Sequence, residues 1–250
     1  MDESAQIPNS QPGGEPERLS LTDRLTDVFF SPNRVFDSLK NRPPAVVNWL
    51  LPMILSMVIT STSLFLLFSQ PAIIQTIRDG MDKSFEPLIA QGKMTTDKAE
   101  QTKEMGIKVM KIATPIGGLA SGAAQLFIGA LISWLVARWG LRVRLDYVKA
   151  MELTGLVMLI SLAGMVVKTW LCMSHGDMLS TVGPALFLEH RDSHNKFHVM
   201  LSQVDLFQFW STGVCACGLS RLCGTSWVKP AVWLYGIWAL LALGSSALAR

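Results

Sequence analysis

The sequence predicts an all-α, polytopic membrane protein: a bundle of five transmembrane helices preceded by an amphipathic helix in the membrane interface. Half of the 250 residues are hydrophobic and only 16% are charged, whereas soluble domains carry about 25% charged residues. No charged residue occurs between Arg42 and Arg78, and ~20 apolar residues suffice to cross a bilayer. The predicted spans are residues 46–69, 112–137, 151–172, 204–222 and 228–249.

The chain is predicted to form one membrane domain, residues 25–250, behind a disordered tail of residues 1–24. The first 20 residues are rich in proline, glycine and acidic residues, with almost no bulky apolar side chain, and such a composition does not offset the entropy of ordering. The first apolar run begins more than 40 residues into the chain. It is too long and too late for a signal peptide, so it is a retained span.

An amphipathic helix is predicted immediately before the first span. Ser31 is a favourable N-cap, and Pro32 is a favourable first helical residue. The apolar side chains of Val35, Phe36 and Leu39 then share one face. Pro43 ends the helix. We expect this helix to lie in the membrane interface; the alternative is a helix that covers the other spans from the water side.

The connection between the first two spans, residues 70–111, is charged, with seven basic and six acidic residues. Apolar residues recur in it at helical spacing, which predicts an amphipathic surface helix. Asp97 and Glu100 resemble a capping pair that starts a helix running into the second span. The apolar residues of the surface helix are Ile74, Ile77, Met81, Phe85 and Leu88.

Within the spans, small and charged residues point to helix packing. Gly118 and Gly122 are four residues apart in the second span, a spacing that favours close helix–helix approach. Glu152 and Lys168 fall 16 positions apart in the third span. Both are therefore expected near the interfaces or facing protein.

Basic residues in the short connections predict the orientation. The densest basic segment is residues 138–149, and basic residues also precede the first span and join the last two spans. Five spans place all three groups on one side, which the positive-inside rule makes cytoplasmic. The N-terminus is then cytoplasmic and the C-terminus outside, although the long 70–111 connection also carries seven basic residues.

Two stretches of the sequence, one before the first span and one at the start of the fourth, resemble the Yip family of integral membrane proteins (Ypt/Rab-GTPase-interacting proteins). The first is Phe30-Ser31-Pro32-x-x-Val35-Phe36-x-x-Leu39-Lys40-x-Arg42-Pro43, and the second opens the fourth span with Asp205-Leu206-Phe207-Gln208-Phe209-Trp210. The resemblance covers roughly residues 28–249. It marks as structural residues Pro32, Val35, Phe36, Pro43, Asp205, Phe207, Trp210 and Gly218.

The resemblance implies a five-span bundle with a cytosolic N-terminus, no established chemistry and no cofactor. The aspartate–leucine–tyrosine–glycine–proline signature of eukaryotic members is absent, which argues against small-GTPase binding and for a bacterial-type member. We therefore expect a multi-pass protein of the cell membrane, specifically a bacterial inner membrane. Its expected partners are the lipid bilayer and other membrane proteins or further copies of itself.

Histidines form the one cluster from which chemistry could arise. His190, His194 and His198 would each lie about 40° further round a helix than the one before and could contact one metal ion. One helix supplies only one side of a coordination shell, so we expect an amphipathic loop helix and no metal. The four cysteines lack zinc spacing and are expected to be small core residues.

Three functions are compatible with these features. The favoured one is a non-enzymatic membrane scaffold or organiser, without catalytic residues. The second is a small transporter or channel component, for which charges or broken helices in mid-membrane would be expected. The third is a histidine-dependent metal-binding protein on the outer side. Nucleic-acid binding is excluded, because the net charge is only +3 and no aromatic-interleaved basic stripe accompanies it.

Overall fold

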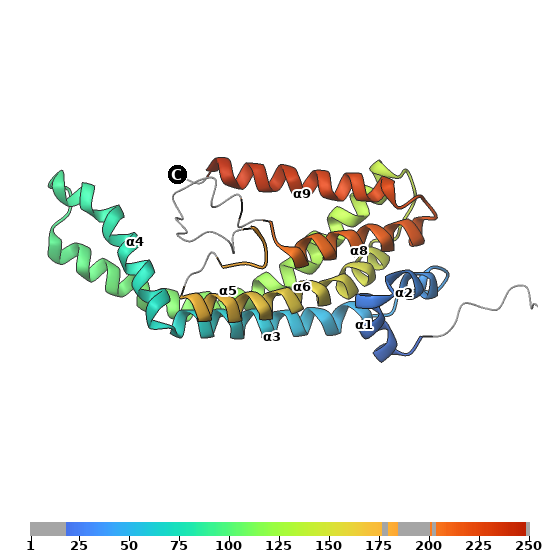
Figure 1. Cartoon of the computed structure of the whole chain (residues 1–250), viewed down its shortest axis with the longest axis horizontal. Coiled ribbons are helices and arrows are strands. Elements are labelled where there is room, and N and C mark those ends of the chain that lie inside the picture. Colours follow the sequence, from blue (N-terminus) through green and yellow to red (C-terminus); the bar gives the residue numbers. More distant parts are fainter. Residues whose placement is uncertain (1–18, 177–179, 185–200, 202–203, 249–250) are drawn as a thin grey trace, which may run out of the picture.

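The structure is a computed structural model that describes residues 19–176, 180–184, 201 and 204–248. Its described elements are all helical, and Figure 1 shows most of them running side by side along one long axis. The helices are α1 (Leu21–Phe30), α2 (Pro32–Leu39), α3 (Val47–Ser69), α4 (Pro71–Ala90), α5 (Thr96–Leu135), α6 (Tyr147–His175), α8 (Leu206–Cys223) and α9 (Val228–Leu248).

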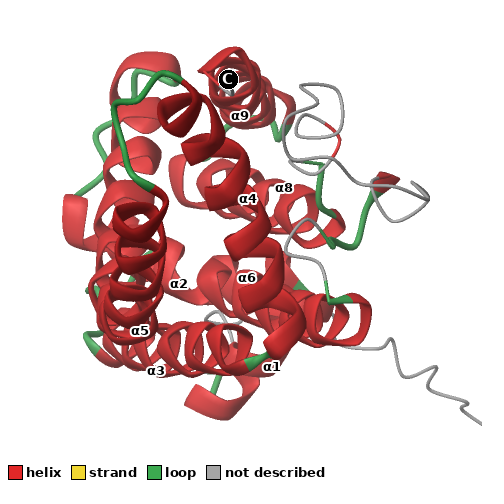
Figure 2. Ribbon diagram, turned by 90° about the vertical axis from the view of Figure 1, so that its left-hand side faces the viewer, coloured by secondary structure: helices red, strands yellow, loops and turns green. Residues whose placement is uncertain are grey.

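Three helices are long and apolar enough to cross a membrane: α3, α5 with the turn that follows it, and α6. A further apolar stretch, Val228–Gly244, lies in α9. The all-α membrane bundle is therefore confirmed, and three of the five predicted spans meet this length and hydropathy requirement. Helix α6 is central, because 61% of its most apolar stretch is buried, against 28% for α3 and for α5. Figure 2, viewed along the bundle, shows α6 surrounded by other helices.

Close backbone contact joins α3 to α5. A Cβ atom built on Gly122 would lie 2.7 Å from the Met57 backbone nitrogen, and one on Gly118 would lie 2.9 Å from the Ser61 Cα. The Ser61 hydroxyl also donates a 2.8 Å hydrogen bond to the Pro115 carbonyl. The glycine spacing predicted this packing face, since only residues without a side chain allow such an approach.

The N-terminal boundary differs from the prediction. Residues 21–24, expected to belong to the disordered tail, form the first turn of α1. Ser20 caps this helix: its hydroxyl accepts a hydrogen bond from the Asp23 N–H, and the Asp23 carboxylate accepts one from the Ser20 N–H, both 3.1 Å. This reciprocal capping box satisfies N–H groups that the first turn would leave unpaired. Residues 1–18 lie outside the described residues.

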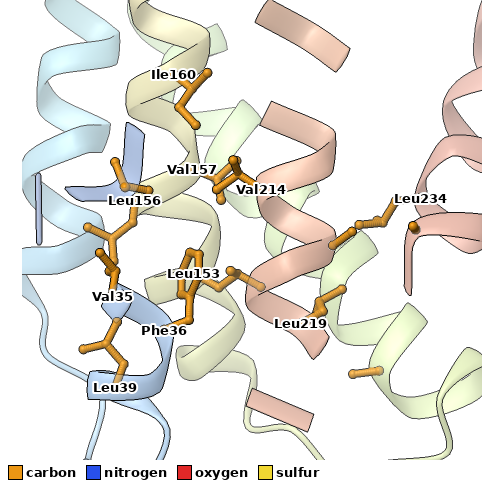
Figure 3. Close-up of a cluster of buried hydrophobic side chains, with 14 of the residues drawn as sticks. Val35, Phe36, Leu39, Leu153, Leu156, Val157, Ile160, Val214, Leu219 and Leu234 are labelled. Carbon is orange, nitrogen blue, oxygen red and sulfur yellow. The ribbon is translucent and has the colours of Figure 1, made fainter. Parts of the chain in front are cut away.

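The amphipathic helix α2 packs against protein. Val35 and Phe36 are completely buried and Leu39 nearly so, in one core cluster with residues of α6 and α8. Figure 3 shows the Phe36 side chain beside Leu153 and the Val35 side chain beside Leu156, both of α6. The apolar face of α2 is therefore covered by other helices of the bundle, and its position at the membrane interface stays a prediction. Ser31 makes no side-chain capping bond, while Pro32 occupies the first turn as expected.

The charged connection forms a helical hairpin of α4 and the first half of α5, which projects beyond the bundle at the end opposite α1 and α2 (Figure 1). Lys103 of α5 joins the two arms through an ion pair with Asp82 of α4 (2.5 Å), and it also pairs with Glu100 of its own helix (2.6 Å). The N-cap of α5 is Thr95, whose hydroxyl accepts from the Lys98 N–H at 3.3 Å. Asp97, the predicted cap, lies in the first helical turn.

Candidate functional site

The first stretch that carries the family resemblance meets Gly218, another residue that the resemblance marks, in one contact between α2 and α8. A Cβ on Gly218 would lie 2.2 Å from Leu153 Cδ1 and 3.0 Å from the Phe36 ring. The absence of a side chain at Gly218 thus allows Phe36 to insert between α6 and α8. The Cys217 thiol adds a polar link, since it donates to the Asn33 side-chain oxygen at 3.0 Å.

A second contact involves the start of α8. Asp205 is the N-cap, and its Oδ1 accepts hydrogen bonds from the Phe207 N–H at 2.8 Å and the Gln208 N–H at 3.3 Å. Its Oδ2 accepts from the Thr181 hydroxyl. One and a half turns into the helix, the Trp210 ring packs edge-on against Phe29 of α1, with ring centroids 5.8 Å apart.

The remaining marked residues lie near these contacts. The Phe207 Cβ lies 2.6 Å from the position a Cβ on Gly164 would take, so α6 and α8 approach closely there. Pro43 is exposed in the connection between α2 and α3. The structure thus gathers most of the marked residues at helix contacts and leaves Pro43 on the surface.

A buried polar network lies behind the α2–α3 connection, centred on Glu152. Its carboxylate is 1% exposed and lies 2.5 Å from the Lys149 ammonium. The other carboxylate oxygen accepts from the Asn48 side-chain amide at 2.6 Å and from the Ala45 N–H at 3.1 Å. Burying a charge is tolerated when it is paired and hydrogen-bonded in this way.

The same network continues into α1 and the preceding connection. The Arg24 guanidinium donates to the Asn48 side-chain oxygen at 2.9 Å, and the Lys149 ammonium also donates to the Arg42 carbonyl at 3.1 Å. The network therefore joins α1, the α2–α3 connection, α3 and α6. Both carboxylate oxygens of Glu152 are occupied by protein donors, which suits a structural role better than proton transfer to a substrate.

A polar cavity of about 640 Å³ lies between α5, α6, α8 and α9. A smaller cavity of about 350 Å³ shares part of its lining and extends it toward the middle of the bundle. Thr154 lines the smaller one with a buried hydroxyl that has no hydrogen-bond partner in the described part of the chain. Polar or charged residues lining the larger cavity are Gln125, Ser161, Lys168, Asp205 and Gln208.

Neither the network nor the cavity follows from sequence spacing. Glu152 and Lys168 were expected near an interface or facing protein; the structure shows Glu152 buried against protein and Lys168 lining a cavity. Asn48 and Lys149 were missed as partners of Glu152, and Arg24 was missed as the partner of Asn48. The available signal was an acid and a base three residues apart, Lys149 and Glu152, at the entry of an apolar helix.

The candidate metal ligands His190, His194 and His198 all lie outside the described residues, so the structure does not test a site formed by them. Among the residues that the structure does describe, no group of histidine, cysteine and acidic residues could hold a metal ion. Cys172 and Cys217 are buried, and Cys215 and Cys223 are half-buried, all four as free thiols. Cys215 lies 3.5 Å from the Ser133 hydroxyl of α5, on a different side of α8 from Cys217.

Comparison with known proteins identifies one family. The model of the Yip1 domain matches residues 26–249, nearly the whole chain. No curated protein and no solved structure matches significantly.

Proposed function

The chain belongs to the Yip1 domain family of membrane proteins, and from this premise we propose that it is a non-enzymatic scaffold or organiser of the cell membrane. The supporting observation is how the bundle uses its charged residues. Glu152, the carboxylate buried in the bundle, has its oxygens committed to Lys149, Asn48 and a backbone N–H. Such a group rigidifies helix packing and is not available to a reactant.

The surfaces left for partners are the apolar sides of the long helices. Exposed side chains on α5 include Ile116, Ile128 and Leu131, and those on α9 include Val232 and Leu240. Lipid tails cover such faces in a bilayer, and another transmembrane helix replaces them when packing is favourable. We propose that a membrane protein partner, or a second copy of this chain, docks on one of these two faces.

The test is purification of the full chain from its native membrane in mild detergent, with quantification of stoichiometric membrane partners. Tryptophan at Ile128 should displace a partner that docks on α5, and tryptophan at Leu240 is the matched change on α9. Loss of the partner in one variant and its retention in the other would support the proposal. A chain that is recovered monomeric without any stoichiometric membrane partner would contradict it.

The polar cavity supports a second candidate, a small transporter or channel component. Its lining includes Lys168 and several amide and hydroxyl groups, and polar groups inside a membrane bundle mark substrate pathways. Cysteine placed at Ser161 in a chain without native cysteines tests this: a water-filled cavity should allow labelling by a membrane-impermeant thiol reagent. Cysteine at the outward-facing Leu131 is the control. Equal labelling of both, or labelling of neither, would argue against a pathway.

We further propose that the protein lies in a bacterial inner membrane with α1 and α2 in the cytoplasm. Support comes from the clustering of the basic connections. The connections that follow α2, α5 and α8 all lie at the end of the bundle that carries α1 and α2 (Figure 1), and two of them, with their flanking residues, contain Arg138, Arg142, Arg144, Lys149, Arg221 and Lys229. Basic residues in short connections favour the cytoplasmic side.

A further inference from the structure

A separate polar pocket of about 550 Å³ lies where α2 meets the connection between α8 and α9. It is at the basic end of the bundle and does not belong to the Glu152 network or to the cavity among α5, α6, α8 and α9. Its lining residues are Asn33, Asp37, Lys40, Cys217, Ser220, Arg221, Gly224, Thr225 and Trp227.

Two cations of this pocket retain unused donors. Arg221 donates from Nε to the Asn33 oxygen at 2.9 Å, and its Nη1 lies 3.4 Å from Asp37, which leaves Nη2 without a partner among the described residues. Lys40 has no hydrogen bond or ion pair within the described part of the chain. Its ammonium lies against the turn at Gly224, since a Cβ there would be 3.7 Å away.

The pocket also contains a buried hydroxyl. The Thr225 Oγ1 is inaccessible to solvent and has no hydrogen-bond partner in the described structure, although burying an unpaired hydroxyl costs free energy. Two cations against one carboxylate, Asp37, leave the lining with net positive charge. Lys229, two residues beyond Trp227, adds a further positive charge beside it.

An apolar surface begins directly beside the pocket. Trp227 and Val228 are about half exposed, and Val232 and Trp233 continue this surface along α9. Tryptophan is enriched where membrane helices pass from hydrocarbon to head groups. The pocket therefore combines cationic donors with an adjacent surface suited to acyl chains, a combination that fits an amphiphile with an anionic head.

We propose that this pocket binds the phosphate of an anionic phospholipid from the surrounding leaflet. Lys40 and Arg221 contact the phosphate oxygens, Thr225 donates its hydroxyl, and the acyl chains lie along the start of α9. Guanidinium and ammonium groups bind phosphate through charge-assisted hydrogen bonds, and basic pockets between transmembrane helices are typical sites for anionic head groups. The site is independent of whether the protein acts as a scaffold or a transporter.

The experiment uses the full chain in a neutral detergent, which removes the charged membrane surface. Short-chain phosphatidylglycerol and short-chain phosphatidylcholine are titrated separately, and binding is counted by native mass spectrometry. We expect saturable binding of the anionic lipid in a 1:1 complex, with a preference over the zwitterionic lipid on the order of tenfold. Inorganic phosphate at millimolar concentration should not displace it, because it lacks the acyl chains.

Lys40→Gln should weaken this binding on the order of tenfold, and since Lys40 is exposed the variant should fold. Thr225→Val, which removes only the hydroxyl, should weaken it by a smaller factor. The control removes two charges at the same end outside the pocket, Arg142→Asn with Arg144→Gln; asparagine suits the positive φ of 56° at Arg142. Equal losses in control and Lys40 variants, no lipid preference, or displacement by inorganic phosphate would each overturn the proposal.

Discussion

At the scale of single residues, the fold depends on a few positions where either a side chain is missing or a charge is buried. Gly122 and Gly218 permit contacts that any Cβ atom would block. Glu152 places a carboxylate inside the bundle, where it binds Lys149 of its own helix and groups from two other segments, the α2–α3 connection and α3. Each of these positions yields an expectation that a matched variant can check.

Gly122→Ala should destabilise the bundle, whereas Gly117→Ala should not. A Cβ at Gly122 would meet backbone atoms of Met57 at 2.7 Å, which cannot rotate away, while nothing lies within 4 Å of the corresponding position on Gly117. Overpacking of this kind costs about 1–3 kcal/mol. Thermal unfolding midpoints in mild detergent measure the difference, and equal midpoints for the two variants would refute close α3–α5 packing.

Removing Glu152 alone should be more damaging than removing its pair. Glu152→Leu leaves the buried Lys149 ammonium without its counter-ion, and breaking a buried pair typically costs about 3–5 kcal/mol. The double variant Glu152→Leu with Lys149→Met removes both charges and should recover much of the loss. Unfolding midpoints of the single and double variants decide this, and a double variant less stable than the single one would be inconsistent with a structural pair.

Asp205→Ala should weaken the start of α8, and Asp205→Asn should largely preserve it. Aspartate and asparagine side chains both accept hydrogen bonds from the N–H groups of the first helical turn. Loss of such a cap costs about 1 kcal/mol. Hydrogen exchange at the amides of Phe207 and Gln208 reports the cap directly. If Asp205→Ala left this exchange unchanged but abolished a transport or signalling phenotype, the carboxylate would have a functional rather than a structural role.

At the scale of helices, local signals place the ends and distant contacts decide the partners. The capping box at Ser20 and Asp23 starts α1, although the composition before it predicts disorder. The N-cap of α5 is Thr95, which immediately precedes the helix and lies two positions before Asp97, the acid that the pattern favoured. Polar side chains within a residue or two of each other compete for the same N–H groups, so the pattern located each helix start only approximately.

The α1 capping box should make the start of this helix sensitive to acid. Hydrogen bonds from Ser20 lower the pKa of the Asp23 carboxyl below its usual 3.8. A carboxyl whose pKa is lower in the folded state stabilises the fold above pH ~4, and this contribution is lost as the pH falls below 3.8 through the folded-state value. Hydrogen-exchange protection of the first turn, corrected for intrinsic rates, should therefore decrease below pH 4.

Asp23→Asn provides the control for this experiment, because it retains a hydrogen-bond acceptor and cannot ionise. Its protection should not show the same step below pH 4. A step of equal size in both proteins would assign the acid sensitivity to another group.

At the scale of the whole molecule, the helices alternate in direction, so the ends of the chain's described part are far apart. Helices α1 and α2 lie at one end of the bundle, and α9 finishes at the other end, where the α4–α5 hairpin projects (Figure 1). Five crossings would then separate the termini by the membrane. We retain this as a prediction, because α3, α5 and α6 alone meet the length and hydropathy requirement among the described helices.

Reporter fusions at Gly14 and at Arg250 should report opposite sides of the membrane. An insertion between Arg142 and Arg144 should report the same side as Gly14, since this connection lies at the α1–α2 end of the bundle. Identical reports from Gly14 and Arg250 would rule out an odd number of spans.

The sequence by itself determined the properties that depend on neighbouring residues. Apolar length predicted α3, α5 and α6, helical spacing predicted α4 and α2, and the Gly118–Gly122 spacing predicted a close packing face. Each of these signals is contained within one helix. Local periodicity sets which side of a helix is apolar, because the helical backbone brings residues three and four positions apart onto one face.

Tertiary structure alone decided what covers each face. The apolar side of α2 suits lipid or protein equally, and burial of Val35, Phe36 and Leu39 in one cluster with residues of α6 and α8 makes it a protein contact. Glu152 accepts a hydrogen bond from Asn48, 104 positions away in the sequence, and Asn33 accepts one from Cys217, 184 positions away. The spacing of residues in the sequence does not predict such pairs, because they depend on how whole helices pack once the chain has folded.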